Sequence, residues 1–252
     1  MSTERDPDDP GRIVPSHSAF DEFAALSAEI ASCKRCPRLV SWREKTARLR
    51  PSLSDQEPYW ARGVPGFGDV DAKLLVVGLA PAAQGANRTG RMFTGDRSGT
   101  FLFSALYRHG YANQPFSSHL RDGLELKGVY VTAAVRCAPP ANLPSSEERS
   151  NCAPYLSAEL ALLRRIEVIL ALGAFAFDAT LRQPLVKARM QSSATRPRFA
   201  HGLQVDLSYP TKEHGPKCVM ASYHPSQRNV YTGLLTTAAF DAIFDRIRDL
   251  LG

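Results

Sequence analysis

The apolar positions of this chain form four short, continuous runs, and stretches with helical periodicity separate them. The continuous runs cover residues 73–79, 129–135, 167–172 and 218–223. Because apolar and polar positions do not alternate within them, they predict strands that are buried on both faces, as in a parallel sheet. Amphipathic patterns typical of helices cover residues 18–32, 98–110, 145–165, 174–183 and 233–251.

This order of strands and helices predicts the fold class. Strands that alternate with helices favour an α/β fold, here a three-layer α/β/α sandwich around a central, mainly parallel four-stranded sheet. A further short strand is a candidate at residues 204–207. Residues 1–16 are polar and contain three prolines, which indicates a disordered tail. We therefore expect a single domain over residues 17–252.

Each predicted strand ends in a distinctive loop. The loops read GLAPA after the first strand, RCAPP after the second, LG after the third and YHPS after the fourth. Ligands bind at the carboxyl ends of the strands in open parallel sheets, so these loops are expected to build one site. The first loop is unusually long, with five glycines from Gly78 to Gly99. Glycines let the backbone approach a ligand closely, whereas most strand–helix loops have only about 2–6 residues.

The composition is that of an ordinary globular chain. Hydrophobic residues make up 44% of the 252 residues and charged residues 22%. No apolar run reaches the ~18 residues of a transmembrane helix, and acidic residues near the N-terminus argue against a signal peptide. A cytoplasmic location is therefore expected, where cysteines serve as metal ligands or free thiols more often than as disulfides.

The net charge favours a polyanionic partner. The formal charge is +6, and because the first sixteen residues carry −2, the remainder carries +8. A basic excess of this kind is typical of proteins that bind nucleic acid, although many basic proteins bind none. The glycine-rich loop contains neither G-x-G-x-x-G nor G-x4-G-K-[ST], which argues against a nucleotide-dependent α/β enzyme.

Four of the five cysteines are candidate ligands of one metal centre. Cys33 and Cys36 form a C-x2-C pair, whose thiolates can reach one metal. Cys137 lies in a strand-end loop and Cys152 in a predicted helix, and both can converge on that pair. Four cysteines suit zinc or a 4Fe-4S cluster, and their spacing does not choose between the two. The alternative is unpaired thiols. Cys218 lies within an apolar strand and is expected to be a core residue.

Several longer motifs occur in an order that resembles one family. They are C-x2-C-P-R-L-V, PYWARGVPGFGD, GLAPA-x2-G-x-NRTGRMFTGD, AVRCAPPAN-x-P, a further cysteine and SYHPS. This order resembles the fifth family of the uracil-DNA glycosylase superfamily, the iron–sulfur type b enzymes, from about residue 31 to the last helix. The resemblance implies a parallel sheet flanked by helices and excision of uracil from DNA. It also implies a 4Fe-4S cluster held by Cys33, Cys36, Cys137 and Cys152.

One position departs from the wider superfamily. Other branches carry a polar or acidic residue in the first motif, where this chain has Ala80 after Leu79. Neither side chain can activate water. The fifth family shares this lack, which supports the assignment and moves the catalytic acid elsewhere along the chain. Gln84 stands where His or Gln is expected in relatives, and it is given no role.

The resemblance implies a catalytic set of Asp96, Asn142 and His224. His224 follows a buried strand and would donate a hydrogen bond to O2 of the departing uracil. Asp96 would position or deprotonate the attacking water, or offset charge on the sugar, and its alternative role is a helix N-cap. Asn142 would hydrogen-bond the base edge or the water. No lysine is obviously placed for a Schiff base, so a monofunctional enzyme is expected.

The expected base pocket takes in parts of three strand-end loops. Phe93 is the candidate stacking platform for an extruded base, and its alternative role is a core aromatic. The base-binding set is Gly78, Ala80, Ala82, Phe93, Asn142 and His224. The small alanines indicate a roomy pocket, and the resemblance implies tolerance of other deaminated bases such as hypoxanthine. We expect the partner to be double-stranded DNA that contains such bases, and the protein to be a monomer.

Contacts to the DNA backbone are expected from basic residues near these loops. Arg88, Arg91 and Arg228 are candidates for phosphate contact, each weighed against an ordinary solvated position. Residues 225–232 could enter a groove of the DNA and fill the gap left by the extruded nucleotide. Lys34, Arg35 and Arg136 would add a basic surface beside the cluster. The competing interpretation is a non-catalytic iron–sulfur module that binds damaged DNA without cutting it.

Overall fold

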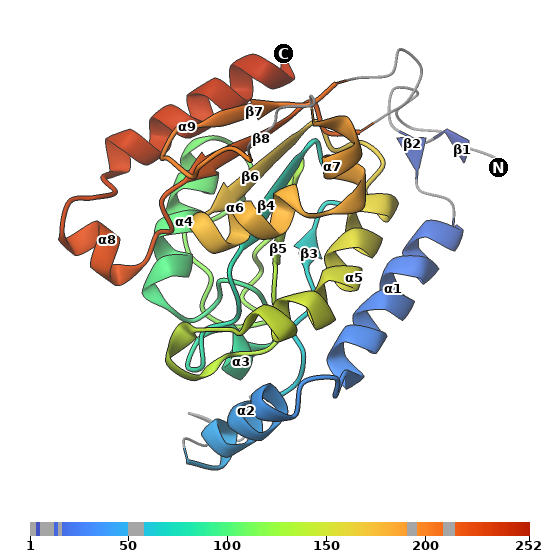
Figure 1. Ribbon diagram of the computed structural model, residues 1–252, viewed down its shortest axis with the longest axis vertical. Coiled ribbons are helices and arrows are strands. Elements are labelled where there is room, and N and C mark those ends of the chain that lie inside the picture. The colour runs from blue at the N-terminus through green and yellow to red at the C-terminus, as the bar shows by residue number, and fades with distance from the viewer. Residues whose placement is uncertain (1–3, 6–12, 15–16, 50–57, 191–195, 209–214) are drawn as a thin grey trace.

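A six-stranded sheet forms the centre of the protein, in the order β3-β5-β4-β6-β8-β7 (Figure 1). The computed structural model describes residues 4–5, 13–14, 17–49, 58–190, 196–208 and 215–252. The four central strands are parallel: β5 (Val129–Ala133), β4 (Leu74–Gly78), β6 (Val168–Leu172) and β8 (Cys218–Ser222). They coincide with the predicted strands, and every position in them is buried.

Two short antiparallel strands extend the sheet, which therefore has six strands rather than the predicted four. β3 (Phe67–Gly68) pairs with β5, and β7 (Gln204–Asp206) pairs with β8. The candidate strand at residues 204–207 is thus confirmed. β3 escaped prediction because it has only two residues, one of them a glycine, and so leaves no hydrophobic run.

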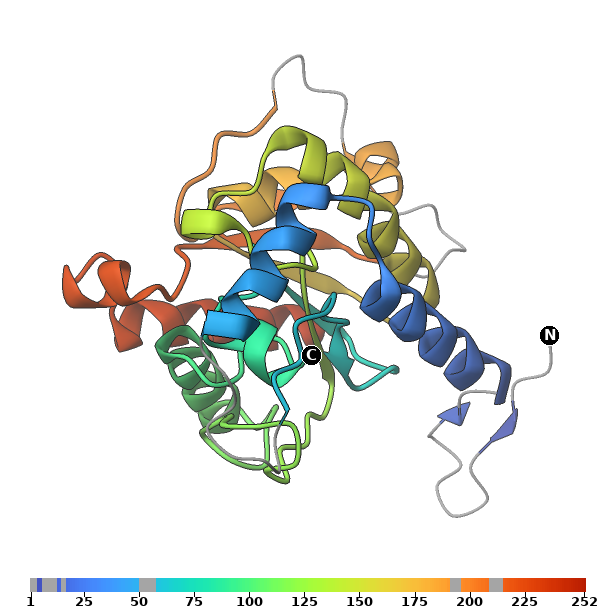
Figure 2. The same cartoon turned by 90° about the horizontal axis from the view of Figure 1, so that it is seen from below.

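Helices cover both faces of the sheet, and the expected three layers are confirmed (Figure 2). One face carries α1 (His17–Ser32), α5 (Ser146–Leu162), α6 (Ala174–Leu181) and α7 (Pro184–Arg189). The other face carries α4 (Arg97–Arg108) and α9 (Thr237–Leu251). The strands supply both interfaces by alternation, because Leu74 and Val76 pack toward α4 and α9 while Leu75 and Val77 pack toward the opposite helices.

Among the described residues, five helical segments occur where the hydrophobic pattern indicated none. They are α7, α2 (Pro37–Leu49), α3 (Ala86–Thr89), η1 (Pro140–Asn142) and α8 (Gln227–Tyr231). The α2 helix buries only Leu39, Arg43 and Thr46, so its sequence lacks an apolar stripe, although Pro37 at its first position favours a helix start. The α8 helix projects from the body of the protein in both views (Figures 1 and 2).

The expected tail at residues 1–16 lies largely outside the described residues. Two short pieces of it are described, β1 (Glu4–Arg5) and β2 (Ile13–Val14), which pair antiparallel with each other. Across the described part of the chain, no helix combines the length and the apolar character that crossing a membrane requires.

Candidate active site and cysteine centre

The four parallel strands bring their carboxyl ends to one edge of the sheet, and the distinctive loops meet there. The loop after β4 and the loop after β5 are tied together by their backbones. Ala134 N donates to Gly78 O at 2.9 Å, and Val135 N donates to Leu79 O at 3.0 Å. Sequence segments more than fifty residues apart therefore share one rigid rim.

Phe93 and His224 lie against each other at this edge. Their ring centroids are 6.0 Å apart and their planes differ by 26°, so the two rings are stacked. Gly78 makes this placement of Phe93 feasible, because a Cβ atom at Gly78 would lie 2.6 Å from the phenyl ring. Phe93 also belongs to the buried core on the α4 side and adopts a positive φ of 54°. The side chain is therefore a core aromatic whose ring also borders His224.

His224 is held as a neutral imidazole. Burial lowers its pKa to about 4, so the ring carries no charge at neutral pH. Its backbone carbonyl accepts hydrogen bonds from Asn229 Nδ2 at 2.8 Å and from Ser226 N at 2.7 Å, which fix the start of the following loop. Gly173, at the end of β6, leaves room for His224, since a Cβ there would lie 3.2 Å from His224 Cβ.

Asp96 serves as the N-cap of α4. Its Oδ1 accepts a hydrogen bond from Gly99 N at 2.8 Å, so the capping role is confirmed. Its second oxygen, Oδ2, lies over Gly85, where a Cβ atom would come within 2.2 Å of it. Burial raises the pKa of Asp96, although backbone donors at Gly99 and Ser98 act in the opposite direction. One carboxylate thus caps a helix and presents a partly desolvated oxygen to the glycine-rich loop.

Asn142 lies on an exposed loop rather than in the buried part of this edge. It closes η1 with φ of 58°, and Ala141 before it has φ of 53°. Asparagine tolerates this left-handed conformation better than most residues do. Its side-chain amide makes no hydrogen bond with any other described residue. The structure therefore brings Phe93 and His224 into contact and leaves Asn142 at the surface.

An aromatic segment that the sequence did not single out for this role supports the glycine-rich loop. Tyr59 donates a short hydrogen bond to Ala83 O and accepts one from Asn87 Nδ2 at 3.2 Å. Trp60 N donates to Arg88 O at 2.9 Å, and its ring fills the space beside Gly90. The adjacent Tyr-Trp pair, placed just before a glycine-rich loop, is the sequence signal that could have indicated this contact.

The three arginines expected to contact phosphate have different environments. Arg228 is exposed on α8, and Arg88 is partly exposed, with Nε donating to Gln84 O at 3.1 Å. Arg91 contradicts the expectation, because it is only 6% exposed and pairs with Asp122 at 2.7 Å. Burial acts to raise the pKa of Asp122, but hydrogen bonds from Arg91 and from the backbone lower it to about 2. Arg91 is thus a structural residue that fastens the glycine-rich loop.

The protruding segment at residues 225–232 is a helix with an exposed aromatic. Tyr231 is 70% exposed, and Arg97 at the start of α4 donates a short hydrogen bond to its hydroxyl. The Arg97 guanidinium also lies 5.6 Å from the centre of the tyrosine ring. The segment is therefore tethered to the residue that follows Asp96.

The four candidate cysteine ligands gather between α1, α2, α5 and the loop after β5. Cys36, Cys137 and Cys152 share one buried cluster, and Cys33 lies beside it at the end of α1. Two side chains donate to the sulfurs: Arg43 Nη1 to Cys137 at 3.0 Å and Asn151 Nδ2 to Cys36 at 3.6 Å. Within the described ranges, no three or more His, Cys, Asp or Glu side chains form a group that could hold a metal ion. Cys218 is a buried strand residue, as expected.

The basic surface expected beside these cysteines is smaller than the sequence indicates. Arg136 is only 1% exposed and pairs with Glu159, which is equally buried, so it contributes nothing to the surface. Arg35 remains accessible, but it pairs with Glu29 at 3.1 Å and lies over the Tyr155 ring.

Comparison with known proteins gives consistent matches over most of the chain. Residues 65–248 match the model of the uracil DNA glycosylase superfamily. Type-5 uracil-DNA glycosylases of Mycobacterium leprae and Thermus thermophilus are 46% and 44% identical over 228 residues, which is 90% of this chain and 95% and 98% of theirs. A Type-4 uracil-DNA glycosylase of Thermotoga maritima is 32% identical over 168 residues, 65% of this chain and 69% of its own. These matches confirm the resemblance found in the sequence motifs.

Proposed function

This chain belongs to the uracil-DNA glycosylase superfamily, and we propose that it excises uracil from DNA by hydrolysing the N-glycosidic bond, which leaves an abasic site. The observation that carries the proposal is the stacked pair of Phe93 and neutral His224 at the carboxyl edge of the sheet. It occurs in a chain that aligns with Type-5 uracil-DNA glycosylases over nine tenths of its length.

The Phe93–His224 pair suits the departing base. An extruded uracil loses its stacking in the duplex, and a pocket that stacks on the ring offsets this cost. Negative charge develops on uracil O2 as the glycosidic bond breaks. A neutral imidazole can donate its N–H to that oxygen without first losing a proton, so the low pKa of His224 does not weaken this role. We assign the small side chains of Ala80 and Ala82 to leaving room for larger bases, although Ala80 also packs against the buried cluster of Cys36, Cys137 and Cys152.

Asp96 suits the handling of water at C1′ of the sugar. Its Oδ1 is occupied by the helix cap, and we assign to Oδ2 the orientation or deprotonation of the attacking water. A raised pKa makes the carboxylate a better proton acceptor than an exposed aspartate. Asn142, on its exposed loop, would reach the base edge or the water once DNA is bound. Water is the only nucleophile that this scheme needs, so we propose a monofunctional enzyme.

The proposal also covers which DNA substrates and which bases the enzyme accepts. We expect double-stranded DNA to be preferred and hypoxanthine to be released as well as uracil. The test incubates the purified protein with duplex and single-stranded oligonucleotides that contain uracil, hypoxanthine or xanthine, and the released base is quantified. Release of free uracil from the duplex without an added cofactor supports the proposal. Tight binding to the uracil duplex with no base released would instead support the damage-binding module.

We further propose that Cys33, Cys36, Cys137 and Cys152 hold a 4Fe-4S cluster. The described side chains do not form a ready-made group for a single metal ion, so the support comes from the chemistry of the donor set. Four thiols are present, three of them share one buried cluster, and side-chain N–H groups are aimed at two of the sulfurs. Hydrogen bonds of this kind are usual at cluster thiolates. When bound, the cluster would link α1, the loop after β5 and α5, a structural role.

Metal content tests the cluster directly. We expect about four irons and four sulfides per chain in protein purified without oxygen. Cys152→Ser should lose most of this iron and lower the melting temperature, because one cluster bond is removed. Cys218→Ser is the matched control, since Cys218 lies in β8, and it should keep its iron. Iron-free wild-type protein containing zinc would contradict the cluster.

The rate of excision should fall on acidification. Asp96 must be ionised and its pKa is raised, whereas His224 must be neutral and its pKa is about 4. Both active forms are therefore the deprotonated ones. Single-turnover rates should be level around neutral pH and should decline as the pH falls through the acid range. The contribution of His224 to stability follows the same direction: its folded pKa lies below the ordinary value, so this contribution is present above about pH 6.5 and lost toward pH 4. The raised pKa of Asp96 acts on stability in the opposite direction. A rate that rises between pH 7 and pH 5 would contradict this assignment.

Arg228 should contribute to DNA binding, and Arg91 should not. Replacing Arg228 with glutamine removes one exposed positive charge, so the slope of log K against log salt should decrease by about 0.9. Arg91→Gln is the matched control. Because Arg91 is buried against Asp122, this change should lower the melting temperature and leave the salt slope unchanged. An unchanged slope in the Arg228 variant would remove that residue from the DNA interface.

A further inference from the structure

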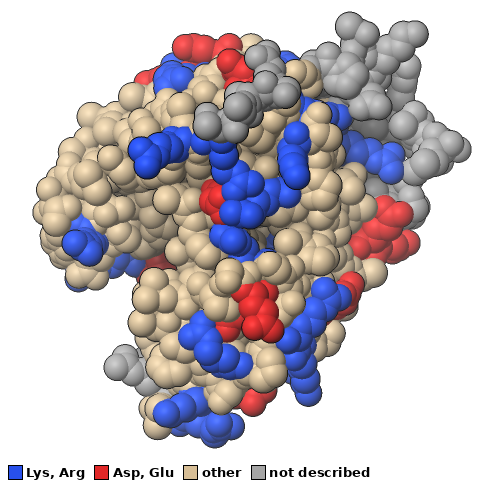
Figure 3. All heavy atoms as spheres, in the orientation of Figure 1, with Lys and Arg blue, Asp and Glu red and all other residues tan. Residues whose placement is uncertain are grey.

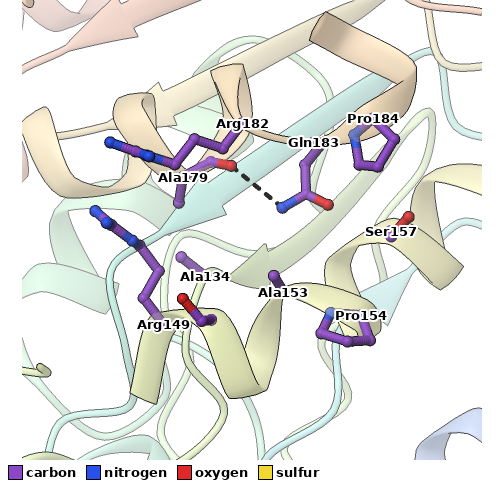
Figure 4. A pocket seen from close by; sticks show the side chains of 10 residues that line it. Ala134, Arg149, Ala153, Pro154, Ser157, Ala179, Arg182, Gln183 and Pro184 are labelled. Atoms are coloured by element: carbon purple, nitrogen blue, oxygen red, sulfur yellow. Dashed lines mark hydrogen bonds between the residues drawn. The ribbon is translucent and has the colours of Figure 1, made fainter. Parts of the chain in front are cut away.

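A cavity whose lining includes neither Phe93 nor His224 lies between α5 and the α6–α7 segment (Figure 4). Its volume is about 510 Å³, within the range of pockets that hold small ligands. Small side chains leave this groove open, since Ala134, Ala153, Ala179 and Ser157 face it where larger residues would fill the space between the helices. Nothing in the excision scheme uses this groove.

One end of the groove is basic. Arg149 and Arg182 line it, and both contact Oδ2 of Asp178 at 2.7 Å. Arg196 contacts the other oxygen of the same carboxylate at 2.6 Å. Three arginines thus share one acid, which leaves two positive charges in excess and several N–H donors without an acceptor among the described residues. Figure 3 shows basic side chains gathered around a small acidic patch on this face of the protein.

The other end is apolar and contains an unpaired buried acceptor. Gln183 is only 3% exposed, and its Nε2 donates to Ala179 O at 3.2 Å. That bond fixes the orientation of the amide, because the reversed amide would place two oxygens against each other. Gln183 Oε1 is then left buried with no donor among the described residues. A buried acceptor without a partner is costly, so this atom indicates a donor that comes from outside the chain.

The two ends face one continuous space. In Figure 4, Arg182 and Arg149 lie above and below one end, and Pro184 and Pro154 lie above and below the other, with Gln183 directed between them. From Arg149 to Ser157 the groove follows α5 for two turns, about 12 Å. This space suits an elongated ligand with an anionic group at one end and a flat, apolar group carrying an N–H donor at the other.

We propose that the α5–α6 groove binds a nucleotide unit, with its phosphate on Arg149 and Arg182 and its base between the two prolines. An amino or ring N–H group of the base donates to Gln183 Oε1. Inorganic phosphate can contact only the arginines at the basic end, and a nucleoside can contact only the prolines and Gln183 at the apolar end. The unit comes either from a free nucleotide or from a nucleotide within a DNA strand. The site does not depend on uracil excision.

Calorimetric titration of the full-length protein with dAMP tests the site. We expect one dAMP per chain, and affinities for inorganic phosphate, deoxyadenosine and N6,N6-dimethyl-dAMP that are each about tenfold weaker. The dimethyl compound keeps the phosphate and the ring but has no N–H for Gln183. Arg182→Gln should weaken both dAMP and phosphate about fivefold, whereas Gln183→Leu should weaken dAMP about fivefold and leave phosphate unchanged.

Matched control variants show whether dAMP binds in the groove or elsewhere on the protein. Arg164→Gln changes an exposed residue and Gln114→Leu a half-buried one, both outside the groove, and both variants should bind dAMP as the wild type does. Melting curves show whether the groove variants are folded. His224→Ala should also bind dAMP normally. Loss of dAMP binding in this variant, with normal binding in Gln183→Leu, would place the nucleotide in the base pocket and overturn the proposal.

A competition experiment distinguishes the two sources of the nucleotide. If a single-stranded oligonucleotide without damaged bases displaces dAMP, the groove receives a nucleotide of a DNA strand. If dAMP stays bound, the groove holds a free nucleotide; both results support the site. Absence of dAMP binding up to about 10 mM, well above the affinity range of specific sites, would overturn it. So would equal affinity in the wild type, Arg182→Gln and Gln183→Leu.

Discussion

Replacing Asp96 with asparagine is expected to slow single-turnover excision of uracil by about 10²- to 10⁴-fold, the range for loss of a positioned general base. The substitution is informative because asparagine caps helices about as well as aspartate. Its side-chain oxygen can still accept from Gly99 N, so α4 should keep its start and the melting temperature should change little. What is lost is the negative charge on the oxygen over Gly85.

Asp96→Ala separates the two roles of this residue. This substitution removes the cap as well as the charge. It should lower the rate as Asp96→Asn does, and it should also lower the free energy of unfolding by about 0.5–2 kcal/mol. If Asp96 were only a cap, the asparagine variant would retain the wild-type rate and the alanine variant alone would show a defect, in stability. Wild-type single-turnover cleavage by Asp96→Asn would therefore exclude a role in handling water.

Replacing His224 with alanine is the second change with a large expected effect. Removal of one donor aimed at a developing anion costs about 10²- to 10³-fold in rate. The imidazole is neutral, with a pKa of about 4, so the loss should be that of an N–H donor and not of a charge. His224→Gln keeps an N–H donor on a side chain of similar length and should therefore recover part of the rate.

A distant histidine provides the control for His224. His109 caps the C-terminal end of α4, and its ring stacks on Phe244 with centroids 5.2 Å apart. His109→Gln should lower stability and leave the rate unchanged. Equal rates in His224→Ala and the wild type, measured on the chemical step, would exclude the proposed contact to uracil O2.

Much of the fold could be predicted because it depends on short stretches of sequence. The four central strands are apolar at nearly every position, and burial on both faces requires that pattern. The helix α2 could not be predicted in this way, because its buried face includes Arg43, whose partner is the sulfur of Cys137. A polar residue with a distant partner is indistinguishable from a surface residue in the sequence.

In the candidate site, too, some features could be predicted from the sequence and others could not. The motif order assigned the family and placed Phe93 and His224 in one pocket, and the structure stacks these two rings. The motifs also suggested phosphate contacts for Arg91, which instead pairs with Asp122, and a basic surface for Arg136, which is buried with Glu159. The sequence around an arginine in a loop motif does not reveal whether its side chain faces DNA or pairs with an acidic residue about thirty positions later, as Arg91 does with Asp122.

The sequence alone determined the α/β fold class, the order of the central strands and helices along the chain, and membership of the glycosylase superfamily. These features rest on local hydrophobic patterns and on motifs. Each pattern or motif spans only a few neighbouring residues, so it can be recognised without knowing the tertiary structure. The tertiary structure alone decided which charges are buried and paired, that His224 is neutral, and that Asp96 both caps α4 and faces Gly85. It also revealed the α5–α6 groove. The physical reason is that ionisation and pairing depend on desolvation by residues distant in sequence, and folding alone brings those residues together.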